Sequence, residues 1–176
     1  MGRFKLNEGD IFAIPLKDNN YGFGQVIAFP RDSDAFIALI YDFKEEKLEK
    51  VDLKTICKKS RLFLGYTFDA KLYHKDWIIL GNFKDNLDTV PLPYHKLGLQ
   101  EEEPRMVDYK GDFVVKIDEN AFHKLDYRTE IAPIRYENAL KAHFGYGEWK
   151  HGDYDKLLYK ETLKSVEIAH RILAKH

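Results

Sequence analysis

The chain has 176 residues, 44% of them hydrophobic and 14% aromatic, which supplies the core of one ordinary domain. Its 28 basic and 29 acidic residues nearly cancel, and this argues against a dedicated nucleic-acid binder, which usually carries a clear basic excess. A single cysteine, Cys57, excludes an internal disulfide framework and any thiolate metal cluster.

No apolar signal core occurs in the opening residues MGRFKLNEGD, and no apolar run approaches the roughly 18 residues that a membrane span needs. The free cysteine fits a reducing compartment. We therefore expect a cytoplasmic protein with no membrane partner.

A β-hairpin is predicted for residues 9–30, GDIFAIPLKDNNYGFGQVIAFP, with a polar turn at 17–20. The first arm, 11–14, is apolar on both faces, which is typical of a strand covered on both sides. The second arm alternates in size, with the large residues Tyr21, Phe23, Ile27 and Phe29 on one parity and Gly22, Gly24, Val26 and Ala28 on the other. The small face leaves room for another part of the fold, or a partner, to approach closely.

Further strands are predicted at 35–43, at about 60–68, at 77–83 and around Phe113, Val115 and Ile117. A solvated, charged connection is expected at 44–50. A long irregular loop is expected at 84–104, where prolines and glycine interrupt any regular pattern. A loop of that length inside a compact domain is usually functional or mobile.

Two helices are predicted in the C-terminal third. One covers 134–144, with Pro133 in its first turn and Gly145 as its stop. Asp153 is expected to cap a longer helix that ends near Ala174 and docks an apolar stripe on the sheet; an exposed partner-binding helix is the alternative. The chain is thus predicted to be a single α+β domain over 1–176, with a strongly bent antiparallel sheet or small β-barrel in 1–118 and helices packed on it in 119–176.

The sequence offers little catalytic chemistry. The glycines of Tyr21-Gly22-Phe23-Gly24 do not continue into a dinucleotide fingerprint, so close packing explains them better. His143 and His151, with Asp153 and Asp155 nearby, form the candidate histidine pair, but they lack metal-site spacing, and no metal or cofactor is expected.

A nucleophilic cysteine is the remaining catalytic hypothesis. Lys58 and Lys59 would lower the pKa of the Cys57 thiol if it were exposed, but a lone cysteine beside Ile56 is more often a small buried hydrophobe. We therefore expect a protein that is not an enzyme.

A basic cluster, Lys58-Lys59-Ser60-Arg61, precedes the aromatic residues Phe63 and Tyr66. This combination suggests an alternative function, a nucleic-acid or peptide-binding module that uses an aromatic-rich sheet. The balanced net charge gives that alternative no support, so direct nucleic-acid binding is not expected.

Acidic residues gather in three places, and they are the candidate partner-binding residues. They are Asp42, Glu45 and Glu46 (with Glu49) around one connection, Asp85 and Asp88 at the start of the long loop, and Glu101, Glu102 and Glu103 at its end. On one common face they would steer a basic partner, whereas ordinary solubilising charge is the alternative.

The runs GDIFAIPL at 9–16 and YGFGQVI at 21–27 resemble the opening signature of the immunity protein 26 family, and WIILG at 77–81 resembles its tryptophan-bearing strand. The resemblance covers mainly residues 9–83. It implies a small cytoplasmic protein of a bacterial polymorphic toxin system that binds and neutralises a cognate toxin without catalysis. If that toxin is a nuclease, its active site is basic, and an acidic loop could occupy the phosphate path. The oligomeric state is left open.

Overall fold

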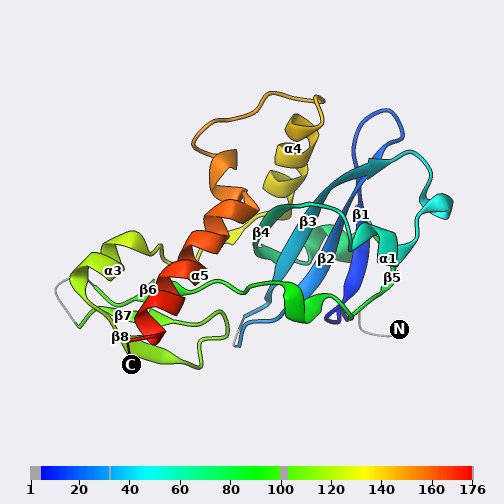
Figure 1. Ribbon diagram of the computed structural model, residues 1–176. Coiled ribbons are helices and arrows are strands. Elements are labelled where there is room, and N and C mark those ends of the chain that lie inside the picture. Colours follow the sequence, from blue (N-terminus) through cyan, green and yellow to red (C-terminus); the bar gives the residue numbers. More distant parts are fainter. Residues whose placement is uncertain (1–4, 32, 100–102, 176) are drawn as a thin grey trace.

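The computed structural model describes residues 5–31, 33–99 and 103–175. A six-stranded sheet has the order β5-β1-β2-β3-β4-β9, and a three-stranded sheet has the order β6-β7-β8. In Figure 1 the large sheet lies on the right and the small sheet at the lower left, and the last helix, α5, runs from one to the other. The α+β prediction is confirmed, with an open sheet that ends at β5 and β9 rather than a closed barrel.

The strands in the described part of the chain are β1 (Asp10–Pro15), β2 (Tyr21–Ala28), β3 (Ala35–Glu45), β4 (Arg61–Phe68), β5 (Ile78–Asn82), β6 (His95–Leu97), β7 (Arg105–Val107), β8 (Val114–Lys116) and β9 (Glu130–Ile131). The helices there are α1 (Leu53–Ile56), α2 (Ala70–Tyr73), α3 (Glu119–Lys124), α4 (Pro133–His143) and α5 (Tyr159–Leu173), with 3-10 turns η1 (Leu48–Lys50), η2 (Leu87–Thr89) and η3 (Tyr154–Leu157). No helix in this part is both long and apolar enough to cross a membrane.

The predicted hairpin is confirmed in β1 and β2. Its turn places Asp18 and Asn19 at φ 57° and 56°. Two successive positive φ values match the twist of the flanking strands, and Asp and Asn are the residues that tolerate them best after glycine. The backbone N–H of Asn20 closes the turn on the carbonyl of Lys17 at 3.1 Å.

Both faces of the large sheet are covered, which explains why β1 and β3 are apolar on both parities. One face, the α4 face, carries Phe12, Phe36 and Ile40 and packs against α2, α4 and η3. The opposite face, the α1 face, carries Ile11 and Leu39 and packs against α1 and the segment 83–92. The core therefore has three layers, with the sheet in the middle.

The face of β2 that carries its small residues is covered by side chains of this chain rather than left open to a partner. A Cβ atom at Gly22 would lie 2.4 Å from a methyl carbon of Leu140 in α4, and one at Gly24 would lie 2.5 Å from the Phe12 ring. The predicted size alternation holds only as far as Ile27. A bulge then pairs Val26 with Ala38 and Ala28 with Ile37, so Ala28 moves to the α1 face.

The tryptophan before β5 ties this packing to α4. The Phe12 and Trp77 rings stack with centroids 5.2 Å apart and planes 5° from parallel. The indole Nε1 of Trp77 donates to the Glu137 carboxylate at 3.0 Å. Burial alone would raise the pKa of Glu137, but hydrogen bonds from Lys141 and Trp77 outweigh it and hold that pKa below its usual value. The carboxylate stays charged, as its ion pair with Lys71 of α2 requires.

The helix predicted at 134–144 is confirmed as α4, with Pro133 at its first position. The predicted start of the longer helix, at Asp153, is wrong, because the helix begins later in the chain. Leu158 adopts an extended conformation and bridges to Phe63 of β4, so the segment before it forms η3 and α5 begins at Tyr159. Asp153 pairs with Arg135 instead of capping a helix. The apolar stripe of α5 docks inward, with Val166 and Ala169 buried, as expected.

The predicted loop at 84–104 is partly ordered structure. It contains η2 and β6, and Val90 is buried against the α1 face of the large sheet. The predicted last strand is confirmed only as the three-residue β8. Sequence analysis did not predict β7, β9 or the short helices α1 to α3.

We expect Gly24→Val to destabilise the fold by about 2–3 kcal/mol, as overpacking a tight core does, because the added carbon atoms would overlap the Phe12 ring. The free energy of unfolding is measured by chemical denaturation. Gly147→Val is the matched control, since its Cβ would have no neighbour closer than 3.9 Å. Equal stability of both variants would show that Phe12 can move aside.

Candidate partner-binding surfaces

The first candidate surface is the β3 acidic group, Asp42, Glu45 and Glu46, at the end of β3. The Asp42 carboxylate lies 2.7 Å from His143 Nε2 at the end of α4. The Glu45 carboxylate accepts from the backbone N–H of Glu46 at 2.9 Å. Asp42 and Glu46 are exposed and Glu45 is half-buried. These carboxylates are therefore held at the junction of the sheet with the segment that follows α4.

A cation lies within this group. Lys44 points to the other side of β3 from Glu45, and its Nζ donates to the Tyr146 hydroxyl at 3.0 Å. The same Nζ lies 4.8 Å from the centre of the Tyr146 ring and 5.5 Å from that of Phe144. The surface at this end of the sheet is thus mixed in sign, with aromatic rings beside the charges.

The second candidate surface is the loop acidic pair, Asp85 and Asp88, and both side chains are exposed. Asn86, which follows Asp85, anchors the segment to the sheet: its Nδ2 donates to Gln25 Oε1 at 2.8 Å. Gln25 is wholly buried, and its Nε2 donates to the Phe83 carbonyl at 2.7 Å. The loop acidic pair therefore sits on a fixed segment.

The third candidate surface contains Glu103, next to β7 of the small sheet. Its carboxylate lies 2.7 Å from Lys116 Nζ, and the hydrogen bond and charge of Lys116 lower the pKa of Glu103. The other two predicted residues, Glu101 and Glu102, lie outside the described residues.

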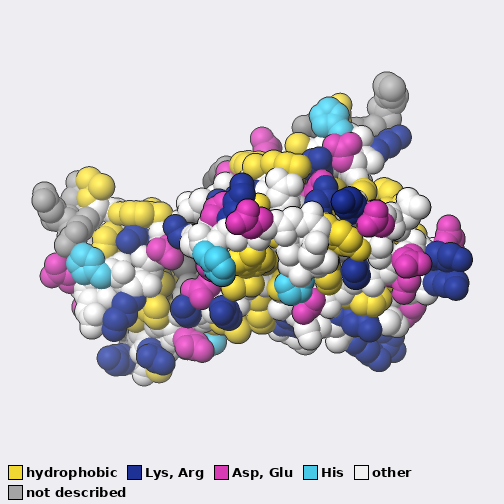
Figure 2. Space-filling model, turned by 90° about the horizontal axis from the view of Figure 1, so that it is seen from above, with side chains coloured by type: hydrophobic (Ala, Val, Ile, Leu, Met, Phe, Trp, Pro, Cys, Tyr) yellow, Lys and Arg dark blue, Asp and Glu magenta, His cyan; other side chains and the backbone are white. Residues whose placement is uncertain are grey.

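The three places are separate. Figure 1 shows β3 running toward the upper right and β7 at the lower left. Within the described residues, no hydrogen bond or ion pair joins the β3 acidic group, the loop acidic pair and Glu103. On the face seen in Figure 2, acidic side chains are scattered among basic ones. Only neighbours in sequence are brought together, and their role in binding stays a prediction.

The aromatic strand of the alternative hypothesis is not available for stacking. Phe63 and Tyr66 are 0% and 2% exposed. Arg61 donates to the Thr89 carbonyl at 2.8 Å and to the Tyr159 hydroxyl at 2.9 Å. A nucleic-acid base needs an exposed ring face, which this strand does not offer.

The catalytic candidates from the sequence also find structural partners. Cys57 Sγ lies 3.8 Å from Gln25 Oε1, and burial raises the pKa of the thiol, the opposite of what a nucleophile needs. His143 pairs with Asp42, whereas His151 lies 3.7 Å from Asp155, so the two histidines do not form one site. Within 5–31, 33–99 and 103–175, no group of three or more His, Cys, Asp and Glu side chains could hold a metal ion.

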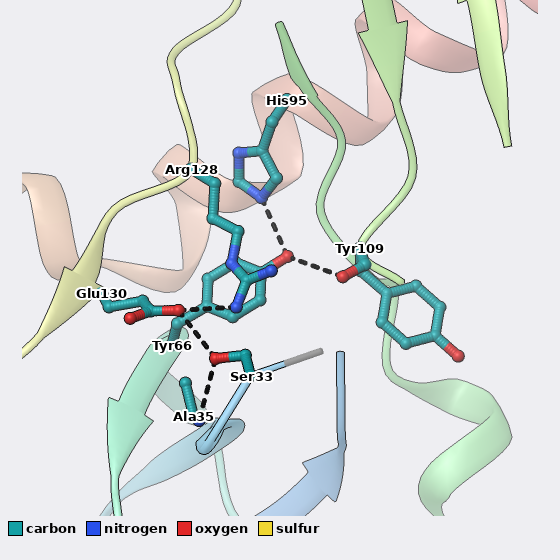
Figure 3. A network of polar contacts seen from close by, with 7 residues as sticks. All are labelled: Ser33, Ala35, Tyr66, His95, Tyr109, Arg128 and Glu130. Atoms are coloured by element: carbon teal, nitrogen blue, oxygen red, sulfur yellow. Dashed lines mark hydrogen bonds and ion pairs between the residues drawn. The ribbon is translucent and has the colours of Figure 1, made fainter. Parts of the chain in front are cut away.

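A polar junction that the sequence did not indicate links the two sheets (Figure 3). The Tyr66 hydroxyl of β4 lies 3.0 Å from His95 Nε2 of β6 and 3.3 Å from the Tyr109 carbonyl. The Arg128 guanidinium lies 4.6 Å from the centre of the Tyr66 ring and pairs with Glu130 at 2.6 Å. No sequence signal could have found it, because its members lie on four segments far apart in the chain.

The junction has a structural role rather than a role in proton transfer. Burial, with the Arg128 charge, lowers the pKa of His95 to about 4, and burial raises the pKa of Tyr66. Both groups are uncharged near neutral pH, where a general acid or base would have to exchange a proton. The junction therefore fixes the small sheet against the large one.

The comparisons with known proteins give one family. A family model described as Immunity protein 26 matches residues 7–103, more than half of the chain. This segment carries β1 to β6, all of the large sheet except β9, together with Gly22, Gly24 and Trp77. It confirms the resemblance seen in the sequence and extends it through β6. No curated protein and no solved structure gives a significant match.

We expect the stability of the protein to fall as the pH drops from about 6.5 to 4, because the unfolded chain binds a proton at His95 that the folded chain excludes. This contribution is at most about 3 kcal/mol, from the separation of the two pKa values. The free energy of unfolding is measured across that pH range for the wild type and His95→Gln, and the variant should show the shallower slope.

His170→Gln serves as the control for this experiment, since His170 is exposed on α5. It should keep the wild-type slope. Equal slopes for the wild type and His95→Gln would mean that His95 becomes protonated without disturbing the junction.

Proposed function

The chain belongs to the immunity protein 26 family, and from this we propose that it neutralises a cognate bacterial toxin by binding the toxin domain directly and occluding its active site, without catalysis. The observation that carries the proposal is the family match, which covers the residues that build most of the large sheet. The protein works in the cytoplasm in this proposal, where a polymorphic toxin would act.

A rigid scaffold supports neutralisation by binding alone. An occluding inhibitor covers roughly 800 Å² of its target, and each loop that must first be ordered weakens the complex. Here the sheet is packed on both faces, and Asn86 fixes the segment of the loop acidic pair to buried Gln25. His143 holds Asp42 in the same way at the end of β3. The Asp42 carboxylate and the backbone that carries Asp85 and Asp88 are thus positioned before a partner arrives.

The acidic charge of the candidate residues supports a toxin whose contacted surface is basic. The candidate partner-binding residues are Asp42, Glu45, Glu46, Asp85, Asp88, Glu101, Glu102 and Glu103. Acidic side chains speed the approach of a basic partner and orient it. The active site of a nuclease has this character, because it binds phosphates, and a nuclease toxin would therefore suit this surface.

The test uses three charge-reversal variants: Glu45→Lys with Glu46→Lys, Asp85→Lys with Asp88→Lys, and a triple change to Lys at Glu101, Glu102 and Glu103. We expect at least one of them to slow association with the cognate toxin domain by about tenfold at low salt, because steering is lost. Association rates come from surface binding measurements, and protection comes from growth during toxin expression.

Glu148→Lys with Glu167→Lys is the matched control, since both side chains are exposed and lie outside these surfaces. It should bind and protect as the wild type does. A wild-type chain that forms no complex with the toxin domain would overturn the proposed function. Full binding by all three acidic variants would overturn the residue assignment and leave the function standing.

A further inference from the structure

A groove of about 490 Å³ lies between α3 and the C-terminal half of α5. Both helices are found in the left half of Figure 1. Its floor is apolar and includes Ala121 of α3 with Ile168 and Ile172 of α5. The two isoleucines also pack on the cluster around Met106 that forms the core of the small sheet. The groove is therefore built on packed elements, and its size is within the range of sites that hold ligand side chains.

Basic side chains surround this floor. Lys116, Lys124, Arg171 and Lys175 line the groove, together with one acidic residue, Asp118. The Asp118 carboxylate already accepts the backbone N–H of Ala121 at 2.7 Å, as the cap of α3. Within the described part of the chain, no ion pair neutralises Lys124, Arg171 or Lys175. The groove thus has a net positive charge and an apolar base.

A carboxylate of the chain itself already forms an ion pair with one of the four basic residues of the groove. Glu103 reaches Lys116 with its Oε1 atom 2.7 Å from the Nζ, while both side chains stay largely exposed. One of the four cations is therefore occupied by the chain itself. The other three make no ion pair with the residues that the structure describes, and carboxylates beside apolar side chains would complement them and the floor together.

The position of the groove indicates a role in selectivity. Its lining residues all lie between 116 and 175, whereas the family model ends at residue 103. The segment that the family shares builds the large sheet, so features that single out one toxin are expected outside it. Discrimination between partners depends on contacts that suit one and not another, and charge is an effective means.

We propose that this basic groove binds an acidic, partly apolar peptide segment of the cognate toxin and thereby selects which toxin the chain recognises. The inference rests on the proposed function and adds to it a site, a ligand chemistry and a role for the C-terminal helices. The groove is one subsite of a larger interface, because 10 residues line it, whereas a stable complex uses roughly 20–30 residues of each partner.

The first experiment tests the groove without any toxin. A short fluorescein-labelled peptide of leucines flanked by glutamates is titrated into the full chain, with a version carrying lysine for each glutamate as the comparison. The wild type should bind the acidic peptide and not the lysine version. This binding should weaken as the salt concentration rises. A variant with Lys124→Glu, Arg171→Glu and Lys175→Glu should bind it at least about tenfold more weakly.

A control variant carries the same net charge change at exposed lysines elsewhere, with Lys54→Glu, Lys58→Glu and Lys156→Glu. It should bind the acidic peptide as the wild type does. An equal loss in this control, or no binding of the acidic peptide by the wild type, would overturn the proposed site. A second groove variant with glutamine at the same three positions removes charge without adding repulsion and should also lose binding.

The second experiment uses the toxin domain and separates the two proposals. If the wild type binds the toxin and the groove variants bind it about tenfold more weakly, the assignment to the toxin is supported. If the groove variants bind the toxin as tightly as the wild type, the inference is overturned while the proposed function stands. If the wild type itself does not bind the toxin, the proposed function has failed instead.

Discussion

The close approach of side chains to the backbone of β2 is the constraint on which the rest of this structure depends. Gly22 and Gly24 leave no room for a side chain on the α4 face, and Leu140 and the Phe12 ring occupy that space. Phe12 in turn stacks on Trp77, whose indole binds Glu137 of α4. The close approach of Leu140 to Gly22 therefore sets the distance of α4 from the sheet. Helix α4 also carries His143, which holds Asp42.

The opposite face is organised by a single buried amide. Gln25 is an unexpected residue for the centre of a sheet, since a polar group buried without partners is strongly unfavourable. The Tyr41 hydroxyl and Asn86 Nδ2 both donate to its Oε1 atom, at 2.6 and 2.8 Å, and the Phe83 carbonyl accepts from its Nε2. The need to satisfy this amide fixes the start of the long loop. The same loop then continues into β6 and so carries the chain to the small sheet.

Sequence analysis predicted the elements that local pattern controls. The hairpin, the strands β3, β4 and β5 and the helix α4 follow from apolar patterns, turn residues and a proline at a helix start. Only β8 of the small sheet was predicted, because its strands have three residues each and their pairing is decided by α5 and the junction around His95. The break at Leu158 was missed for a similar reason: its bridge to Phe63 is a contact between residues far apart in the chain. The acidic residues could be named from the sequence, but not the basic groove, whose walls are helices far apart in the chain.

On the proposed function, the two kinds of surface have different tasks. The acidic groups at the end of β3 and on the anchored loop belong to the segment that the family model matches, whereas the basic groove belongs wholly to the part beyond it. A partner that meets carboxylates in one place and cations in another can dock in one orientation only, because any other brings like charges together. The large sheet holds the first surface, and the junction of Tyr66 with His95 fixes the second relative to it. Selectivity would then depend on the rigidity of that junction as much as on the charges, since a loosely attached groove would accept acidic segments from many directions.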